Sequence, residues 1–359
     1  MKKHLALPAA LLLILALTFQ GCSGDEKNDP DKPQHLGAPL SIVSPANEDQ
    51  LIVGETVEIE IEVTDPSRVK NLQLFFADTL YQDALKSESQ KISIPTTTNS
   101  KVGFHKVYFA YEDDKGEKHG DTRTVVFFSD KAPEQLSAVN MKVFPHDKSS
   151  YTQGLEFYKG KLYEGTGQPG NSILGEIDLT SGKILRKIDL ESRYFGEGIT
   201  ILNDTIYQIT WSEKTCFVYD LNFTKIKEFS YDGEGWGLCN DGTYLIMSNG
   251  TNEIVWRDRN TFNIVKRIYV FTDVNDIAAL NELELIDGKL YINVYQEDRI
   301  IVVDPATGKV VQEIDCTSIS RDGRIAGADV LNGIAHNPET GKTYITGKWW
   351  PKLYEVKFE

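Results

Sequence analysis

Short runs that alternate apolar and polar residues fill the second half of the chain, and most of them end in turns rich in Gly, Asp and Asn. Alternation with a period of two predicts half-buried β-strands, and these turn residues suit antiparallel hairpins. One strand sequence recurs at intervals of roughly 40 to 45 residues, for example as "QGLEFYKGKLYEG" and "NELELIDGKLYINVY". The copies are headed, at the same phase, by Gln153, Glu197, Trp236, Asn281 and, in a fifth copy, Asn332.

Repeats of this length, each with the pattern of a four-stranded meander, are typical of a β-propeller, whose innermost strands converge on a central channel. The pattern predicts a five-bladed β-propeller over residues 139–359, with the residues that head the copies pointing into one small volume. The fifth copy ends in one clear strand, "KLYEVKF", so its blade needs a strand from elsewhere. We expect "VNMKVFPH", at 139–146, to pair with the C-terminal blade and close the ring.

A separate module precedes the repeats, over residues 39–130, with a linker expected at 131–138. Its short alternating strands are separated by Gly, Pro, Asp and Ser turns and show no helical period, which predicts an immunoglobulin-like β-sandwich. The fold class is therefore all-β. The module carries no residues that suggest catalysis, so a spacer is expected, with carbohydrate or protein binding as the open alternative.

The N-terminus has the plan of a secretory signal, with a short basic region, an apolar run over residues 5–19, and then "FQGC". A small residue followed by Cys22 resembles a bacterial lipobox. We therefore expect a signal peptide at 1–21, lipidation of Cys22 and a flexible polar tether at 22–38. An ordinary cleaved signal with an incidental Cys is the alternative. The expected location is the bacterial cell envelope, as an outer-membrane lipoprotein that faces either the periplasm or the cell surface.

Charge and cysteine content restrict the partners. A formal net charge of −15 argues against nucleic acid and against an anionic membrane surface, so contact with the membrane is expected only through the lipid. Apart from Cys22 there are three cysteines, Cys216, Cys239 and Cys316, and an odd number cannot all pair internally. No disulfide framework is expected, although a pair between Cys216 and Cys239 stays open. We expect a monomer.

Five stretches closely resemble the glutaminyl-peptide cyclotransferases of the plant and bacterial type. They are "FPHDKSSYTQGLEF", "YFGEGITILNDTIYQITW", "EGWGLCNDG", "LNELELIDGKLYINVY" and "VLNGIAHNPETGKTYITGKWWP", which lie in order between about Lys142 and Val356. The resemblance implies a five-bladed propeller that cyclises the N-terminal glutamine of peptides or proteins to pyroglutamate and releases ammonia. It also implies that no metal or other cofactor is needed, unlike in the unrelated zinc-dependent animal enzymes.

Cyclisation needs little beyond folding the substrate into ring geometry and moving protons, because the nucleophile belongs to the substrate itself. One carboxyl group can take a proton from the amine and return it to the leaving nitrogen. Glu197, between two glycines that allow close approach, fits this role and matches the general acid/base of the family. By the same resemblance, Lys348 stabilises the developing oxyanion, and Asn281 and Gln153 hold the amide and amine of the substrate.

Aromatic side chains should exclude water and grip the aliphatic part of the glutamine. The residues that match the family's aromatic lining are Trp211, Trp236, Phe195, Tyr151 and Tyr295. Two of them depart from the family, which commonly has Phe where Tyr151 stands and Trp where Tyr295 stands. Each change keeps a ring but adds a hydroxyl, which can alter substrate choice or rate without abolishing the site.

Other functions fit less well. A zinc site needs about three clustered ligands, whereas the propeller region has only His146 and His336, which lie far apart in sequence. The main alternative is a surface propeller without catalytic activity that binds peptides or glycans. Retention of Glu197 together with Lys348 argues against that alternative, because binding alone requires neither an acid nor a cation at those positions.

Overall fold

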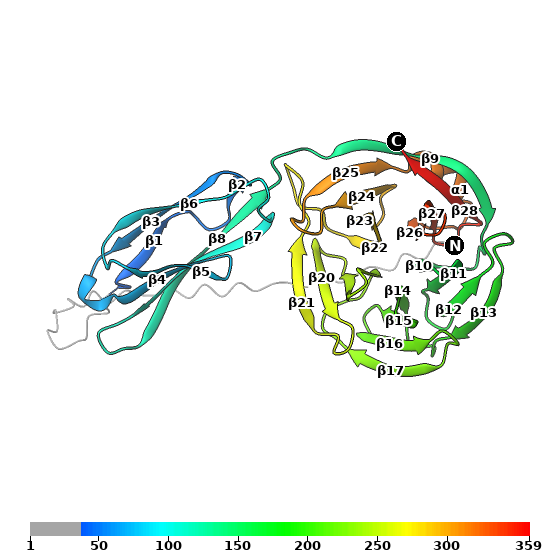
Figure 1. Ribbon diagram of the computed structural model, residues 1–359, viewed down its shortest axis with the longest axis horizontal. Helices are drawn as coiled ribbons and strands as arrows, with labels where there is room; N and C mark the ends of the chain where they lie inside the picture. The colour runs from blue at the N-terminus through cyan, green and yellow to red at the C-terminus, as the bar shows by residue number, and fades with distance from the viewer. Residues whose placement is uncertain (1–36) are drawn as a thin grey trace, which may run out of the picture. The chain divides into compact units, whose positions relative to one another are not determined.

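The structure is a computed structural model that describes residues 37–359, and its regular elements are almost all β-strands (Figure 1). The prediction of an all-β protein is confirmed. Residues 39–359 form one compact unit. The expected signal peptide, Cys22 and nearly all of the expected tether lie outside the described residues. Within the described part of the chain, no helix is both long and apolar enough to cross a membrane.

The N-terminal part contains two sheets, one of three strands in the order β1-β3-β6 and one of five strands in the order β2-β8-β7-β4-β5. Their side chains alternate between buried and exposed; Val57, Ile59 and Ile61 on β3, for instance, are all buried in the core. This is the period-two pattern that the sequence shows. The elements are β1 (Leu40–Ser44), β2 (Asp49–Ile52), β3 (Thr56–Val63), η1 (Pro66–Arg68), β4 (Lys70–Phe76), β5 (Thr79–Leu85), β6 (Gln90–Pro95), β7 (Gly103–Glu112) and β8 (Lys118–Phe128).

Residues 134–359 form a ring of β-sheets, and each of its first three sheets has four antiparallel strands that run from the innermost to the outermost in chain order (Figure 1). The innermost strands β10, β14, β18, β22 and β26 contact one another in this order, and β26 contacts β10 again, so the ring is closed. The strands of the first three sheets are β10 (Thr152–Tyr158), β11 (Lys161–Thr166), β12 (Ile173–Ile177), β13 (Ile184–Asp189), β14 (Gly196–Leu202), β15 (Thr205–Thr210), β16 (Thr215–Asp220), β17 (Lys225–Ser230), β18 (Leu238–Asn240), β19 (Tyr244–Ser248), β20 (Glu253–Asp258) and β21 (Ile264–Tyr269).

The last part of the ring is an eight-stranded sheet in the order β22-β23-β24-β25-β9-β28-β27-β26. Its middle strand β9 pairs in parallel with β25 and antiparallel with β28. The predicted pairing of the strand at 139–146 with the C-terminal blade is thus confirmed. The elements are β9 (Glu134–Pro145), β22 (Leu280–Ile286), β23 (Lys289–Val294), β24 (Arg299–Val303), β25 (Val310–Asp315), α1 (Thr317–Gly323), β26 (Leu331–Asn337), β27 (Lys342–Gly347) and β28 (Lys352–Phe358).

The strand β9 begins earlier than the sequence analysis expected. Its first residues occupy most of the segment 131–138, where we expected a linker. The polar side chains of this stretch explain the difference, because they are used across the strand pair: Gln312 donates to Glu134 at 2.7 Å, and Gln135 donates to Glu313 at 3.1 Å. The pairing gives the outer edge of β25 a partner strand, which an edge would otherwise lack.

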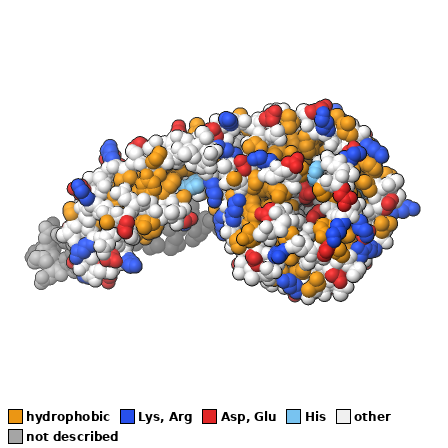
Figure 2. All heavy atoms as spheres, viewed as in Figure 1, with side chains coloured by type: hydrophobic (Ala, Val, Ile, Leu, Met, Phe, Trp, Pro, Cys, Tyr) orange, Lys and Arg blue, Asp and Glu red, His pale blue; other side chains and the backbone are white. Residues whose placement is uncertain are grey.

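Apolar side chains between neighbouring sheets form separate clusters around the ring. One example contains Leu283, Leu290 and Ile292 next to Ile246 and Ile254, all of them buried. On the outside, acidic and basic side chains are interspersed over the face shown in Figure 2. The packing between sheets therefore holds the innermost strands rigidly around the centre, where the polar residues gather.

Candidate active site

All nine side chains that the sequence analysis assigned to chemistry or substrate binding line one cavity of about 220 Å³. Its size is suited to a single amino-acid side chain with its amine. The lining residues are Tyr151, Gln153, Phe195, Glu197, Trp211, Trp236, Asn281, Tyr295 and Lys348. The structure thus brings together residues that are spread over almost 200 positions of the sequence.

A larger groove of about 670 Å³ lies against Trp349. Its ionisable side chains, Lys148, Lys187 and Asp189, are exposed to solvent. Exposed charges are strongly screened and gain little from one another. We therefore place the chemistry in the smaller cavity, where ionisable groups are buried and converge.

Irregularities in the innermost strands turn the polar residues toward the centre. The ladder between β10 and β11 skips Gln153, the ladder between β14 and β15 skips Glu197 and the next residue, and the ladder between β22 and β23 skips Asn281 and the next residue. A bulged residue leaves the ladder, and its side chain takes a new direction. The same local feature thus delivers one side chain from each of these three innermost strands to the cavity.

The glycine after Glu197 has a packing reason. A Cβ atom on Gly198 would lie 2.4 Å from the backbone nitrogen of Leu238 on the neighbouring innermost strand. Real side chains do not approach so closely, so only glycine allows the two strands to meet here. The close approach expected from the sequence is therefore one between neighbouring strands, and it fixes where Glu197 sits.

Glu197 is a buried carboxyl group, with 5% of its surface exposed. Burial raises its pKa well above the ordinary value; the positive charge of Lys348 works in the opposite direction, and the negative charges of Glu213 and Glu234 add to the rise. A carboxyl group with a raised pKa exchanges protons with amines far more readily than an ordinary carboxyl group, because its pKa is closer to that of the amine. Glu197 is thus suited to accept a proton and to return it.

A chain of amide hydrogen bonds orients Glu197. Asn332 donates through Nδ2 to Gln153 Oε1 at 3.1 Å and to the carbonyl oxygen of Thr152 at 2.9 Å. Because the Oε1 atom of Gln153 accepts from Asn332, its Nε2 faces the carboxyl group and donates to Glu197 Oε1 at 3.2 Å. One oxygen of Glu197 is therefore held, and Gln153 favours the charged form of the carboxylate.

Lys348 lies in the turn after β27 and is also buried, with 3% of its surface exposed. Burial lowers the pKa of its ammonium group, while the charges of Glu197 and Asp329 partly restore it. The Nζ atom lies 4.9 Å from the centre of the Tyr151 ring and 5.0 Å from that of Tyr295, so the two rings flank the cation. Ring faces attract a cation without accepting its protons as firmly as a carboxylate would. The N–H groups thus stay available to a ligand.

The aromatic walls contact one another and are anchored by one carboxylate. Phe195 lies between Tyr151 and Trp211, at centroid distances of 6.1 and 5.8 Å. A single oxygen, Oε2 of Glu234, accepts the indole N–H of Trp211 at 2.8 Å and that of Trp236 at 2.9 Å. The two tryptophans are thus tied to each other at the mouth of the cavity.

The hydroxyl group by which Tyr151 differs from a phenylalanine has a defined partner. It donates to Asp329 Oδ2 at 2.8 Å. Burial, followed by the effects of Asp329, raises the pKa of this phenol, so it stays protonated. Tyr295 packs edge-on against Trp236 at 5.4 Å and remains part of the wall. Both departures from the family are therefore accommodated in the structure.

Asn281 contributes an amide whose Oδ1 atom is buried and has no hydrogen-bond partner among the described residues. Its backbone carbonyl accepts from Ser248 at 2.7 Å, which fixes the main chain at this point. A buried acceptor without a partner is costly, and a ligand that donates to it recovers that cost. The amide is therefore suited to hold an amine or amide N–H of a substrate.

Sequence reasoning did not assign three residues that the structure places at or beside the site: Asn332, Glu234 and Asp329. The first was detectable, because Asn332 heads the fifth repeat at the phase of the other site residues. Glu234 lies in the loop before β18 and Asp329 in the loop between α1 and β26, where no periodic pattern marks them. Their roles depend on which side chains the loops approach, which only the folded structure reveals.

The cavity provides one carboxylate and neither histidine nor cysteine, which is too few ligands for a typical zinc site. Among residues 37–359, a grouping with the spacing of metal ligands occurs at Asp113, Glu117 and His119, at the connection between β7 and β8, and none of these lines the cavity. The cysteines Cys216, Cys239 and Cys316 are buried and free, so the pair that the sequence left open is not formed.

Comparisons with known proteins match the part of the chain that forms the ring. The family model for glutamine cyclotransferase matches residues 118–358. A glutaminyl-peptide cyclotransferase of Arabidopsis thaliana is 38% identical over 223 residues, which cover 60% of this chain and 69% of that protein. The crystal structure of a glutaminyl cyclase from Myxococcus xanthus superposes with a TM-score of 0.60 at 31% identity, over 63% of this chain and 98% of that one.

Proposed function

This chain belongs to the glutamine cyclotransferase family, and we propose that its cavity converts the N-terminal glutamine of peptides and proteins to pyroglutamate with release of ammonia. The protein is thus a glutaminyl-peptide cyclotransferase, an acyltransferase. The observation that carries the proposal is the convergence of a buried acid, a buried cation and an unpaired amide oxygen in a cavity of about 220 Å³ walled by aromatic rings.

In the proposed reaction, the α-amine of the substrate attacks its own side-chain amide carbon. Glu197, as the carboxylate, takes the proton that the amine loses when the new C–N bond forms. It then gives this proton to the departing nitrogen, which leaves as ammonia when the old C–N bond breaks. An α-amine has a pKa of about 7.7. The raised pKa of Glu197 therefore reduces the difference in pKa between the amine and the carboxyl group.

The tetrahedral intermediate carries negative charge on the former amide oxygen. We assign Lys348 to this oxygen, since its buried ammonium is flanked by rings and forms no direct salt bridge with any residue of 37–359. Asn281 and Gln153 hold the nitrogen atoms of the substrate, and the walls formed by Trp211 and Trp236 contact its methylene groups. Steps of this kind need no metal ion.

Finer features of the architecture belong to the same proposal. We interpret the ring as a five-bladed β-propeller, with β10–β13, β14–β17, β18–β21 and β22–β25 as four blades and β26–β28 with β9 as the fifth. The two N-terminal sheets form an immunoglobulin-like sandwich that serves as a spacer. Lipidation at Cys22 anchors the protein in the bacterial cell envelope, and protease treatment of whole cells would separate surface exposure from a periplasmic location.

Ammonia release from a dipeptide that begins with glutamine tests the function directly. We expect stoichiometric pyroglutamate and ammonia from the purified protein in the presence of a metal chelator. A protein that binds a non-cyclising analogue but releases no ammonia would instead be a peptide-binding propeller, and the proposal would be wrong.

The pH dependence can be tuned through Glu234. In Glu234→Gln, the amide oxygen still accepts the two indole N–H groups, but the negative charge that helps to raise the pKa of Glu197 is lost. The pKa of Glu197 should fall, so the acidic limb of kcat/KM moves to lower pH while KM changes little. Glu234→Ala should instead raise KM roughly three- to tenfold, the effect of losing one or two hydrogen bonds. An acidic limb that moves upward in Glu234→Gln would contradict this account.

A further inference from the structure

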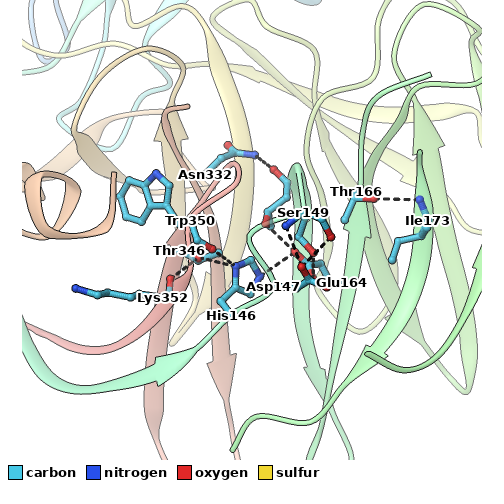
Figure 3. A network of polar contacts seen from close by, with 12 residues as sticks. His146, Asp147, Ser149, Glu164, Thr166, Ile173, Asn332, Thr346, Trp350 and Lys352 are labelled. Atoms are coloured by element: carbon cyan, nitrogen blue, oxygen red, sulfur yellow. Dashed lines mark hydrogen bonds and ion pairs between the residues drawn. The ribbon is translucent and has the colours of Figure 1, made fainter. Parts of the chain in front are cut away.

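A buried histidine–glutamate pair lies outside the cavity lining, and the mechanism above does not use it (Figure 3). His146 Nε2 and Glu164 Oε1 are 3.1 Å apart, and their side chains are 1% and 0% exposed. His146 follows β9, and Glu164 lies on β11. The pair therefore joins the first sheet of the ring to the strand that closes it.

Glu164 holds the segment that carries two site residues. Its Oε1 accepts from the hydroxyl of Thr152 at 2.7 Å, and its Oε2 accepts from the hydroxyl of Ser150 at 3.1 Å. These two residues flank Tyr151, and Gln153 follows directly. Both carboxylate oxygens are thus occupied in fixing residues 150–153.

His146 holds the segment that carries Lys348. Its Nδ1 lies 2.8 Å from the carbonyl oxygen of Trp350 and 3.5 Å from the hydroxyl of Thr346. A carbonyl oxygen and a carboxylate can only accept, so both ring nitrogens donate and the ring is an imidazolium.

The pKa of His146 agrees with this assignment. Burial lowers this pKa, but the charge and hydrogen bond of Glu164, the carbonyl of Trp350 and the charge of Asp147 outweigh burial and raise it. The charge and hydrogen bond of Glu164 thus stabilise the imidazolium form of His146.

The two segments also meet directly. The backbone nitrogen of Trp349 donates to the carbonyl oxygen of Ser150 at 2.7 Å, and the Trp349 ring lies 4.6 Å from that of Tyr151. Trp349 has a φ of +61°, in the left-handed region that a side chain rarely adopts. The turn that presents Lys348 is thus held in an unusual conformation by contacts from the 150–153 segment and from His146.

We propose that His146 and Glu164 are positioning residues that together fix Lys348 and Gln153 relative to Glu197. This role rests on the proposed function, because it matters only if those groups act on one substrate. Replacing a buried ion pair with apolar residues is often neutral for stability, so stability alone does not explain such a pair. A positioning role in catalysis does explain the pair, since a displacement of about 1 Å in a reacting group can cost roughly 10²-fold in rate.

The test compares the same substitution at two carboxylates of one sheet. Glu164→Gln removes the charge that keeps His146 protonated and should lower kcat by roughly 10- to 100-fold with KM within about threefold. Glu176→Gln is the matched control, because Glu176 lies on the adjacent strand β12, pairs with Lys161 and Arg186, and touches neither segment. Its kcat should stay within about twofold of wild type, as expected for a site outside such a network.

A double-mutant cycle and a milder variant complete the test. His146→Gln and Glu164→Gln combined should lose less kcat than the product of the two single losses, because two amides can still bridge the segments. Thr152→Val keeps the shape but removes the 2.7 Å hydrogen bond, and should lower kcat several-fold without unfolding. Normal kcat in Glu164→Gln or Thr152→Val, an equal loss in Glu176→Gln, or additive losses in the cycle would each overturn the proposal.

Crystal structures of Glu164→Gln and Glu176→Gln provide a readout that does not depend on activity. We expect Lys348 and Gln153 to shift in the first variant and to keep their positions in the second. A wild-type protein without ammonia release would refute the proposed function, whereas unshifted side chains in Glu164→Gln would refute the positioning role. The two failures are therefore distinguishable.

Discussion

Replacement of Glu197 with glutamine is expected to lower kcat for Gln-initiated peptides by roughly 10²- to 10⁴-fold, the usual contribution of a positioned acid/base. Glutamine keeps the shape of the side chain and can still bond to Gln153, but it cannot accept and return a proton. Substrate affinity should therefore change little. Steady-state ammonia release, together with the binding of a non-cyclising analogue, measures both effects.

Stability is the control for this variant, and its direction can be derived. The pKa of Glu197 is raised in the folded protein, so above the unfolded pKa the unfolded state loses its proton more readily than the folded state. Stability contributed by the protonated carboxyl is thus lost as pH rises from the unfolded toward the folded pKa. Glutamine does not ionise, so the variant does not lose stability in this way as pH rises. Its Tm at neutral pH should therefore equal or exceed that of wild type. A Glu197→Gln protein with near-normal turnover would refute the mechanism.

The repeat pattern made the site predictable because residues at the same phase of successive repeats come together at the centre of the closed ring. Gln153, Glu197 and Asn281 occupy the same phase of their repeats, and the bulges of the innermost strands turn all three into one cavity. The periodicity also required a closing strand, which β9 provides. The site residues and the closing strand could therefore be predicted from the sequence, because both follow from the regular repeat.

Features that arise from irregular segments could not be predicted from the repeat pattern. The first half of β9 has polar side chains and looks like a linker, because its partner β25 satisfies its hydrogen bonds from a distant part of the chain. Glu234 lies in the loop before β18, and one of the two indoles that it accepts from, that of Trp211, belongs to the preceding sheet. The pairing of His146 with Glu164 likewise depends on ring closure, which brings the end of β9 next to β11.

The departures from the family pattern now have a physical interpretation. A phenylalanine in place of Tyr151 would lack the hydrogen bond to Asp329, which here ties the aromatic wall to the segment before β26. Tyr151 and Tyr295 also provide the two rings that flank Lys348. The substitutions thus alter the support of the cation rather than the set of chemical groups, and they leave the proposed mechanism intact.

Removal of the Lys348 ammonium is expected to lower kcat by roughly 10²- to 10³-fold, the typical effect of losing one oxyanion-stabilising donor in a site shielded from water. Lys348→Ala tests this, and Lys348→Met is the matched control, because Met fills most of the space between the two tyrosine rings without a charge. If charge is the cause, both variants lose activity alike, whereas recovery in Lys348→Met would assign the effect to packing. The charge of Lys348 also lowers the pKa of Glu197, so in both variants that pKa should rise and the acidic limb of kcat/KM should move to higher pH. A variant that retains wild-type kcat, or whose acidic limb moves to lower pH, would show that Lys348 does not act on this site as a cation.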